Sequence, residues 1–437
     1  MRSSNNRLHR IAKIIRLPVS RSLRRNEYKT SLRRPGGIDM ARMWRSETAY
    51  RLMARLVRGF LVFGILSCTV VDSDARRAAP QPLFNVGYQV FDLKYRKDGQ
   101  EPTLTVAVWY PTAAQPKSHN YGGPTSGNVA VDAAPHAEGG PYPFLVFSHG
   151  YGGGGLGAVF FTEALAARGW IVACPDHHDK HSAVRIRTGQ EKDFDRLALL
   201  RHAKEIAASG PGDRGKYLYR LDEMSLVLDG ILTSGPFAKL IDRDRVAVGG
   251  HSFGGFTALG LSGTIEERHE TRIKAVLLFS TGAGGYLFRE DELAAVRIPS
   301  MLFMGEREED QWRGSKTMSE LSAKIYRNVS SPKYFLEVKG ASHFSFNNRF
   351  ADNRRTRLLS GTEEQFDVIR RYSIAFLEKH VAGRKDSGHM LERSDSLLAR
   401  YVTEPVADAS KQNLKAPEER MRRAEPDAPA DADKPRR

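Results

Sequence analysis

Apolar residues in this chain gather in short runs that alternate with longer amphipathic stretches. Continuous apolar runs of three to eight residues, rich in β-branched and aromatic side chains, predict buried strands. They lie at 143–150, 170–176, 246–248, 273–280, 298–305 and 333–340. Helical spacing falls between them, at 157–168, 217–232, from Phe253 onward and at 363–382. This alternation predicts an α/β fold, with a mostly parallel central sheet and helices on both faces.

The flanking regions have different patterns. Residues 83–110 alternate as strands around the turn-like Lys97-Asp98-Gly99, and 111–142 form a polar connection rich in Gly, Pro and Ala. We expect a charged, irregular insertion at 182–213 and a last helical or irregular piece at 386–407. The catalytic domain is therefore predicted at 83–407, followed by a disordered charged tail at 408–437.

The net charge of +16 is concentrated near the N-terminus. Residues 1–58 hold 16 Lys and Arg against three acidic residues, and form a basic N-terminal extension. The remainder has no zinc-ligand spacing, basic-aromatic repeat or helix-turn-helix pattern, so we do not expect nucleic-acid binding.

An uncharged run, GFLVFGILSCTVV, follows at 59–71 and is short for a bilayer span. Basic residues precede it and small residues follow, so 59–75 is predicted to be the hydrophobic and cleavage region of an export signal. The alternatives are an uncleaved membrane anchor and a lipoprotein attached through Cys68. The other cysteine, Cys174, would then have no partner, so no internal disulfide is expected.

The sequence Gly250-His251-Ser252-Phe253-Gly254 joins a predicted strand to a predicted helix. Such a G-x-S-x-G turn holds its serine in strained backbone angles, and its neighbours must lack bulk. The hydroxyl then projects above the sheet beside a helix N-terminus. Ser252 is the candidate nucleophile.

A nucleophilic serine needs a base and an orienting acid, which follow it along the chain in this fold. His343 lies in GASHF, just beyond the strand at 333–340, which we take as the last strand, and is the candidate base. The acid is sought after the strand ending at Gly305, where Glu306, Glu308, Glu309 and Asp310 occur. Glu308 is the first choice, Asp310 the second and Glu309 the third.

Two backbone N–H groups are the expected oxyanion donors. The first belongs to Phe253, directly after the nucleophile, and the second to Tyr151 in the glycine-rich loop HGYGGGG at 149–155. His149 is expected to hold that loop by hydrogen bonding. The loop lacks the lysine and serine or threonine of a phosphate-binding loop, so no cofactor is predicted.

Two polar clusters have other interpretations. Asp176-His177-His178-Asp179, with His181, fits no metal-ligand spacing and is expected to form a pocket wall or hydrogen-bonded rim. Arg185, Arg187, Lys192 and Arg196 form a charge run that is expected to be solvated, although it could attract an anionic substrate.

The blocks FSHGYGG, GWIVACPDHHDKHSA, DRVAVGGHSFGG and GASHF resemble the plasma-type platelet-activating-factor acetylhydrolases and their bacterial relatives, described as predicted dienelactone hydrolases. The resemblance covers about 83–385 and implies an α/β-hydrolase fold and a metal-free serine esterase, with oxyanion donors matching Tyr151 and Phe253. The acetylhydrolases carry their acid after the strand corresponding to 273–280, where this chain has Ser280-Thr281. The bacterial branch takes it after the next strand, which points to Glu308.

The sequence thus predicts an exported serine esterase acting on a small-molecule or lipid ester through an acyl-enzyme on Ser252. The GASHF block is also similar to secreted polyester-degrading and cutinase-like hydrolases, so a polyester or lipid substrate stays open. A hypothesis of another class is a catalytically inactive surface binding protein on a hydrolase scaffold. No pattern indicates an oligomeric state.

Overall fold

The computed structural model describes residues 83–405, apart from 97–98, 123–124, 191–194, 311, 314–315 and 349–359. The basic extension, the hydrophobic segment and almost all of the charged tail lie outside these residues. None of the helices within them is long and apolar enough to cross a bilayer.

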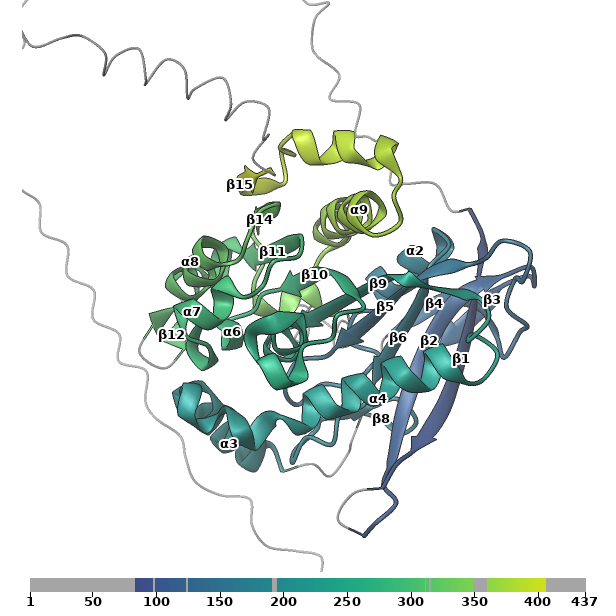
Figure 1. Cartoon of the computed structure of the whole chain (residues 1–437), viewed down its shortest axis with the longest axis horizontal. Coiled ribbons are helices and arrows are strands. Elements are labelled where there is room, and N and C mark those ends of the chain that lie inside the picture. The colour runs from purple at the N-terminus through teal and green to yellow at the C-terminus, as the bar shows by residue number, and fades with distance from the viewer. Residues whose placement is uncertain are drawn as a thin grey trace, which may run out of the picture. The chain divides into compact units, whose positions relative to one another are not determined.

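A twisted sheet runs through the centre of the described region (Figure 1). Its order is β15-β14-β11-β10-β9-β5-β6-β2-β1-β4-β3. The strands from β6 to β14 pair in parallel, whereas β1, β2 and β6 pair antiparallel at one side and β15 pairs antiparallel with β14 at the other. The parallel strands are β5 (Tyr142–Ser148), β6 (Ile171–Pro175), β9 (Ile241–His251), β10 (Ile273–Phe279), β11 (Ser300–Gly305) and β14 (Lys333–Val338). The others are β1 (Asn85–Lys94), β2 (Thr103–Thr112), β3 (Lys117–Asn120), β4 (Ser126–Val131) and β15 (Leu398–Glu404).

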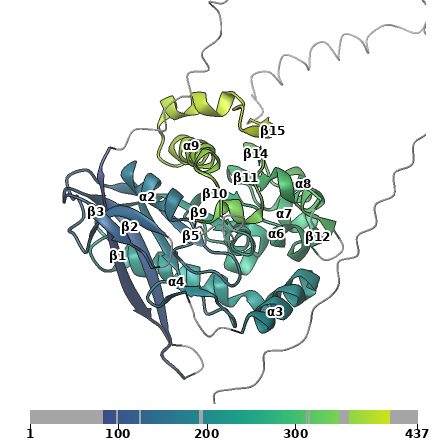
Figure 2. The same ribbon diagram turned by 180° about the vertical axis from the view of Figure 1, so that it is seen from behind.

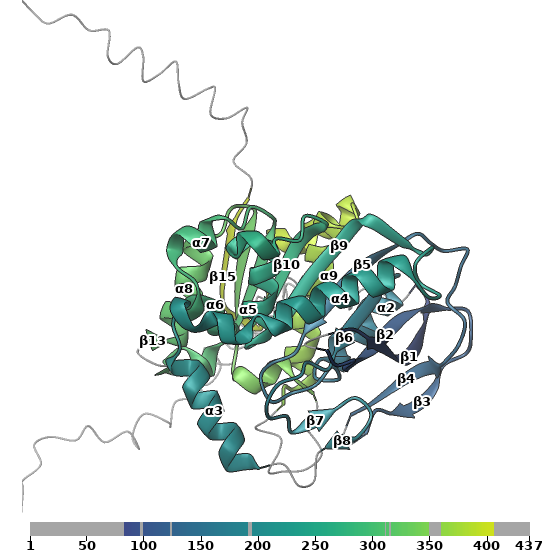
Figure 3. The same ribbon diagram turned by 60° about the horizontal axis from the view of Figure 1, so that its bottom comes forward.

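Helices cover both faces of this sheet, as the reverse and tilted views also show (Figure 2, Figure 3). One face carries α2 (Val159–Ala167) and α9 (Glu363–His380). The opposite face carries the remaining helices near the sheet. These are α4 (Tyr219–Thr233), α5 (Gly254–Leu259), α6 (Ala283–Leu287), α7 (Glu290–Ala294) and α8 (Met318–Asn328). The predicted α/β class is therefore confirmed.

Strand alternation explains why the central strands read as continuous apolar runs. In β5, Phe144 and Val146 enter the core under α4 and α5, while Leu145 and Phe147 enter the core under α2 and α9. Both faces of a parallel sheet are covered, so both sets of side chains are mostly apolar. Most positions of the central strands are buried for this reason.

Three regions differ from the sequence expectation. The connection at 111–142 contains the hairpin β3–β4, and β4 adds to the sheet beside β1. The insertion at 182–213 contains a regular helix, α3 (Arg196–Ala208), in which only Ile206 is buried. The segment at 386–407 includes the edge strand β15, so the strand at 333–340 is not the last one. These elements escaped prediction because they are mostly exposed: β15 buries only Leu398, so no period of two appears.

Candidate active site

Five neighbouring strands place the candidate residues along one edge of the sheet. Because β5, β9, β10, β11 and β14 are parallel, their carboxyl ends meet there. From β14 to β5, the residues following these strands include His343, Glu308, Ser280, Ser252 and the glycine-rich loop. Their order across the sheet is therefore their order in the sequence, read in reverse.

The turn around Ser252 is sharp. Ser252 has φ of 55°, in the left-handed region that costs energy for a residue with a side chain. Its N–H donates to the carbonyl oxygen of Phe279 on β10, at 2.8 Å. A Cβ at Gly250 would lie 2.2 Å from the oxygen of Gly254, and one at Gly254 would lie 2.0 Å from the oxygen of Ser148. Both flanking positions therefore require glycine.

His343 begins a short 3₁₀ turn, His343–Phe346, after β14. Its Nε2 lies 2.9 Å from the Oγ of Ser252. The ring of His251, from the end of β9, hydrogen-bonds through Nε2 to the backbone oxygen of His343, at 3.0 Å. Burial, and to a smaller extent the charge of the nearby His343, lower the pKa of His251 to about 3, so His251 is a neutral donor that holds the loop.

Among the four candidate acids, Glu308 is the one that hydrogen-bonds to His343 in the described part of the chain. Its Oε2 lies 3.2 Å from His343 Nδ1, and its side chain is fully buried. Burial alone would raise the pKa of Glu308, but the hydrogen bond and charge of His343, with other donors, hold it below its usual value. Glu306 is exposed and accepts from the N–H of Gly340, whereas Asp310 is exposed and Glu309 half-buried.

Ser280 was not among the predicted site residues, yet it contacts two of them. It follows β10, is fully buried, and also has a left-handed backbone, with φ of 46°. Its Oγ lies 2.7 Å from Glu308 Oε2 and 2.6 Å from His343 Nδ1. The one available signal was a hydroxyl residue at the carboxyl end of a buried strand.

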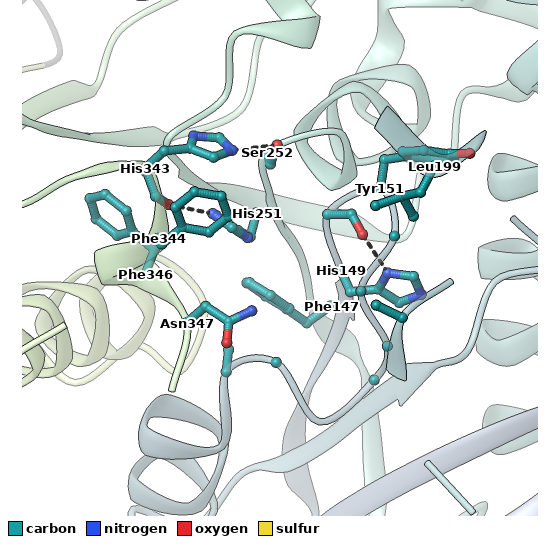
Figure 4. Close-up of a pocket in the computed structure, with 18 residues that line it drawn as sticks. Phe147, His149, Tyr151, Leu199, His251, Ser252, His343, Phe344, Phe346 and Asn347 are labelled. Atoms are coloured by element: carbon teal, nitrogen blue, oxygen red, sulfur yellow. Dashed lines mark hydrogen bonds between the residues drawn. The ribbon is translucent and has the colours of Figure 1, made fainter. Parts of the chain in front are cut away.

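A cavity of about 160 Å³ opens at Ser252 (Figure 4). Aromatic side chains line one part of it, and Tyr151 and Leu199 lie across from His343. The backbone N–H groups of Tyr151 and Phe253 have no hydrogen-bond partner among the described residues. Other lining residues are Phe147, His149, Phe344, Phe346 and Asn347.

The family model "Platelet-activating factor acetylhydrolase, isoform II" matches residues 120–201 and 222–396, more than half of the chain. The chain belongs to this family. Curated relatives include the platelet-activating factor acetylhydrolases of Cavia porcellus, 27% identical over 314 residues, and of Bos taurus, 26% identical over 305 residues. The alignments cover 64% and 62% of this chain, and 68% and 64% of those enzymes.

A ferulic acid esterase from Streptomyces cinnamoneus is similar in structure. The TM-score is 0.54 at 19% identity, over 76% of this chain and 96% of that one. This likeness concerns the α/β-hydrolase fold alone. The family match, together with the named relatives, classes the chain as a carboxylic ester hydrolase.

In this member of the acetylhydrolase family, the Asp-His-His-Asp cluster braces the glycine-rich loop. Asp176 accepts from the N–H of Gly155 at 2.7 Å and from that of Ile186 at 2.6 Å. His177 Nδ1 donates to Glu223 Oε2 at 2.7 Å, which leaves Nε2 to accept from the hydroxyl of Ser148 at 2.8 Å. No group of three or more metal-ligating side chains is found within the described ranges. The cluster forms a hydrogen-bonded wall behind the glycine-rich loop.

A buried ion pair completes this wall. Arg220, on α4, donates to both oxygens of Asp179, at 2.8 and 2.6 Å, and both side chains are fully buried. The same guanidinium donates to the backbone oxygen of His149 at 2.8 Å and lies 4.9 Å from the ring centroid of Phe253. Burial alone would raise the pKa of Asp179, but Arg220 holds it well below its usual value. One charged group thus contacts Phe253, which carries one expected oxyanion donor, and His149, two residues before Tyr151, which carries the other.

His149 also takes part in holding the loop. Its Nδ1 hydrogen-bonds to the oxygen of Gly150 at 2.7 Å, and its Nε2 accepts from the N–H of His177 at 3.1 Å. The ring is buried and does not contact Ser252 or His343. His181 lies outside the wall, with its ring 5.8 Å from that of His202.

Proposed function

We propose that this protein is a serine esterase that hydrolyses carboxylic esters through an acyl-enzyme on Ser252. The observation that carries the proposal is the 2.9 Å separation of Ser252 Oγ and His343 Nε2 at the cavity. A nucleophile within hydrogen-bonding distance of a base that is itself oriented by an acid is the arrangement acyl transfer requires.

The charge on Glu308 determines which nitrogen of His343 is protonated. A carboxylate can only accept hydrogen bonds, so the Nδ1 nitrogen of His343, on the side of Glu308, carries the hydrogen and acts as the donor. Nε2 then carries the lone pair and accepts the proton of Ser252 as its hydroxyl attacks the ester carbonyl. The protonated imidazole returns that proton to the departing alcohol, and water repeats the cycle on the acyl-enzyme.

The N–H groups of Tyr151 and Phe253 are the proposed oxyanion donors. Both lack partners among the described residues, and Arg220 contacts the ring of Phe253 and the backbone of His149, two residues before Tyr151. Donors fixed before the substrate arrives lower the barrier without reorganisation, each by about 3–4 kcal/mol. The buried wall behind the loop supplies this fixation.

The substrate is proposed to be an ester with an apolar acyl group. Phe147, Phe344, Phe346 and Leu199 line the cavity and suit a hydrocarbon chain. The curated relatives are named for platelet-activating factor, an ester-containing phospholipid class, whereas a soluble polyester fragment is the other candidate. A series of p-nitrophenyl esters from acetyl to octanoyl, followed by an acetylated phospholipid and a short polyester, distinguishes these classes by kcat/KM.

Ser252→Ala tests the proposal directly. It should abolish hydrolysis of p-nitrophenyl acetate, by about a million-fold in kcat, with an unchanged unfolding midpoint. A fluorophosphonate probe should label the wild-type chain at Ser252 and leave Ser252→Ala unlabelled. A wild-type chain that is neither active nor labelled would instead favour the binding protein on a hydrolase scaffold.

We also propose that the chain is exported and that residues 83–407 form the catalytic domain. The support is the order of basic residues, short hydrophobic run and small residues before 76. Mass spectrometry of the mature N-terminus tests this proposal: a start shortly after residue 73 indicates cleavage, an acylated Cys68 indicates a lipoprotein, and an intact segment indicates an anchor.

A further inference from the structure

The position of Ser280 in the sheet sets it apart from an ordinary buried serine. β10 lies between β9, which leads to Ser252, and β11, which leads to Glu308. A residue at the carboxyl end of β10 therefore stands between the nucleophile's strand and the acid's strand. Its hydroxyl is within hydrogen-bonding distance of both Glu308 and His343.

The distances favour the hydroxyl over the carboxylate as the partner of His343. Nδ1 is 2.6 Å from Ser280 Oγ but 3.2 Å from Glu308 Oε2, and the second distance is long for a charge-assisted bond. A serine hydroxyl has one proton and two lone pairs. Because Glu308 can only accept, the proton of Ser280 points to Oε2, and its lone pair faces Nδ1–H.

The backbone supports a dedicated role for this residue. Ser280, like Ser252, has a positive φ, and its N–H donates to the oxygen of Phe303 at 2.8 Å. Strain of this kind costs about 1–3 kcal/mol and persists where the surroundings fix it, commonly at functional sites. The next residue, Thr281, is also buried, but its Oγ1 has no hydrogen-bond partner among the described residues. The polar contacts of this turn thus converge on Ser280.

We propose that Ser280 is a positioning residue that links Glu308 to His343, so that the orienting unit is carboxylate, hydroxyl and imidazole in series. This rests on the proposed esterase function. The Ser280 hydroxyl accepts from Nδ1–H and fixes the tautomer, while Glu308 fixes the direction of the hydroxyl. Glu308 is itself held by the N–H of Gly305, which donates to Oε1 at 2.7 Å.

Ser280→Ala and Ser280→Gly test the link. Each removes the hydroxyl, and the glycine also relieves the backbone strain, so the pair separates the two effects. We expect kcat/KM for p-nitrophenyl acetate to fall on the order of 10- to 100-fold in both, the effect of one hydrogen bond to a charged network. Thr281→Val is the matched control, because it deletes an unpartnered hydroxyl in the same turn, and it should keep kcat/KM within about two-fold.

The pH profile distinguishes positioning from packing. The protonated imidazole loses its nearest acceptor in Ser280→Ala, so the acid limb of kcat/KM should move to lower pH. Glu308 and the neutral His251 are the other titratable groups that face His343, and neither is altered in this variant. Thr281→Val should leave the limb in place.

A double-mutant cycle measures whether Ser280 and Glu308 act as one unit. In the proposed series, Ser280→Ala should add less than three-fold to the loss caused by Glu308→Gln. Fully additive losses, or Ser280 variants that keep wild-type kcat/KM and an unmoved acid limb, would overturn the proposal. Failure of the esterase proposal is distinct, because the wild-type chain itself would then be inactive and unlabelled by fluorophosphonate.

Discussion

Removing the charge of Asp179 should destabilise the protein more than removing an exposed charge does. Asp179→Asn keeps the size of the side chain but leaves the Arg220 guanidinium buried without its counter-ion. Both side chains are fully buried, and the carboxylate also accepts from the hydroxyl of Tyr219 at 2.7 Å. Breaking one partner of such a pair costs about 3–5 kcal/mol. That is a large part of the roughly 5–15 kcal/mol by which a domain is stable.

The matched control is the exposed pair of Arg96 and Glu101, whose side chains are 88% and 63% exposed. Glu101→Gln should change the free energy of unfolding by less than about 1 kcal/mol. Urea unfolding followed by circular dichroism measures both variants. The reasoning is refuted if Asp179→Asn is as stable as Glu101→Gln.

A second substitution separates the loss of stability from the loss of activity. Asp179→Asn/Arg220→Met removes the unpaired charge, so it should be more stable than Asp179→Asn alone. Its activity should stay low, because the bond from Arg220 to the oxygen of His149 is also lost. A displacement of the loop by about 1 Å would lower kcat on the order of 100-fold. Recovery of both properties together would mean that Arg220 does not brace the loop.

Three further outcomes follow from the same contacts. Glu308→Gln should lower kcat by about 10³- to 10⁴-fold, while Glu309→Gln stays within two-fold; equal losses in ester-hydrolysis assays would contradict the choice of acid. Leu199→Trp should narrow the cavity and lower kcat/KM for octanoyl esters at least about ten-fold more than for acetyl esters, because the larger ring occupies the space that the longer chain needs. An equal loss for both esters would mean that the acyl group does not bind beside Leu199. Burial alone would raise the pKa of Glu223. Hydrogen bonds from His177 and His178 outweigh it and lower this pKa from 4.5 to about 2. The stabilisation that Glu223 contributes is therefore complete above pH 4.5 and lost as the pH falls toward 2. Between these pH values, the free energy of unfolding measured in urea should fall less in Glu223→Gln than in wild type, by up to roughly 3 kcal/mol.

The buried half of the fold could be read from the sequence, and the exposed half could not. Strands such as β5 and β9 are covered on both faces, so their apolar runs are continuous and their positions follow from composition. The edge strand β15 and the hairpin β3–β4 are fixed by backbone pairing to a neighbour, which leaves little trace in side-chain chemistry. For the same reason α3, with one buried residue, read as a solvated insertion.

Within the candidate site, the residues fixed by local turns were easier to predict than those fixed by distant contacts. Ser252 lies in a turn whose glycines are required by clashes with residues close in sequence or on the next strand. Glu308 competed with three neighbouring acids, because a run of carboxylates does not reveal which one is buried. Glu308 is placed beside His343 by the close approach of the loops that follow β11 and β14. A Cβ at Gly305 would lie 2.5 Å from the oxygen of Ala341, and Arg307 N–H donates to that oxygen at 2.9 Å.

Ser280 shows why part of such a site is out of reach of sequence patterns. A hydroxyl residue at the end of a strand is common, and the absence of a carboxylate there read as a missing acid. Its partners come from loops 28 and 63 residues further along the chain. The adjacent places of β10, β11 and β14 in the sheet bring these loops together, and those places are set by long-range strand pairing. If the hydroxyl does relay the charge of Glu308, then an acid on one strand and a serine on the next perform together what a single carboxylate would do, and neither can be assigned without the other.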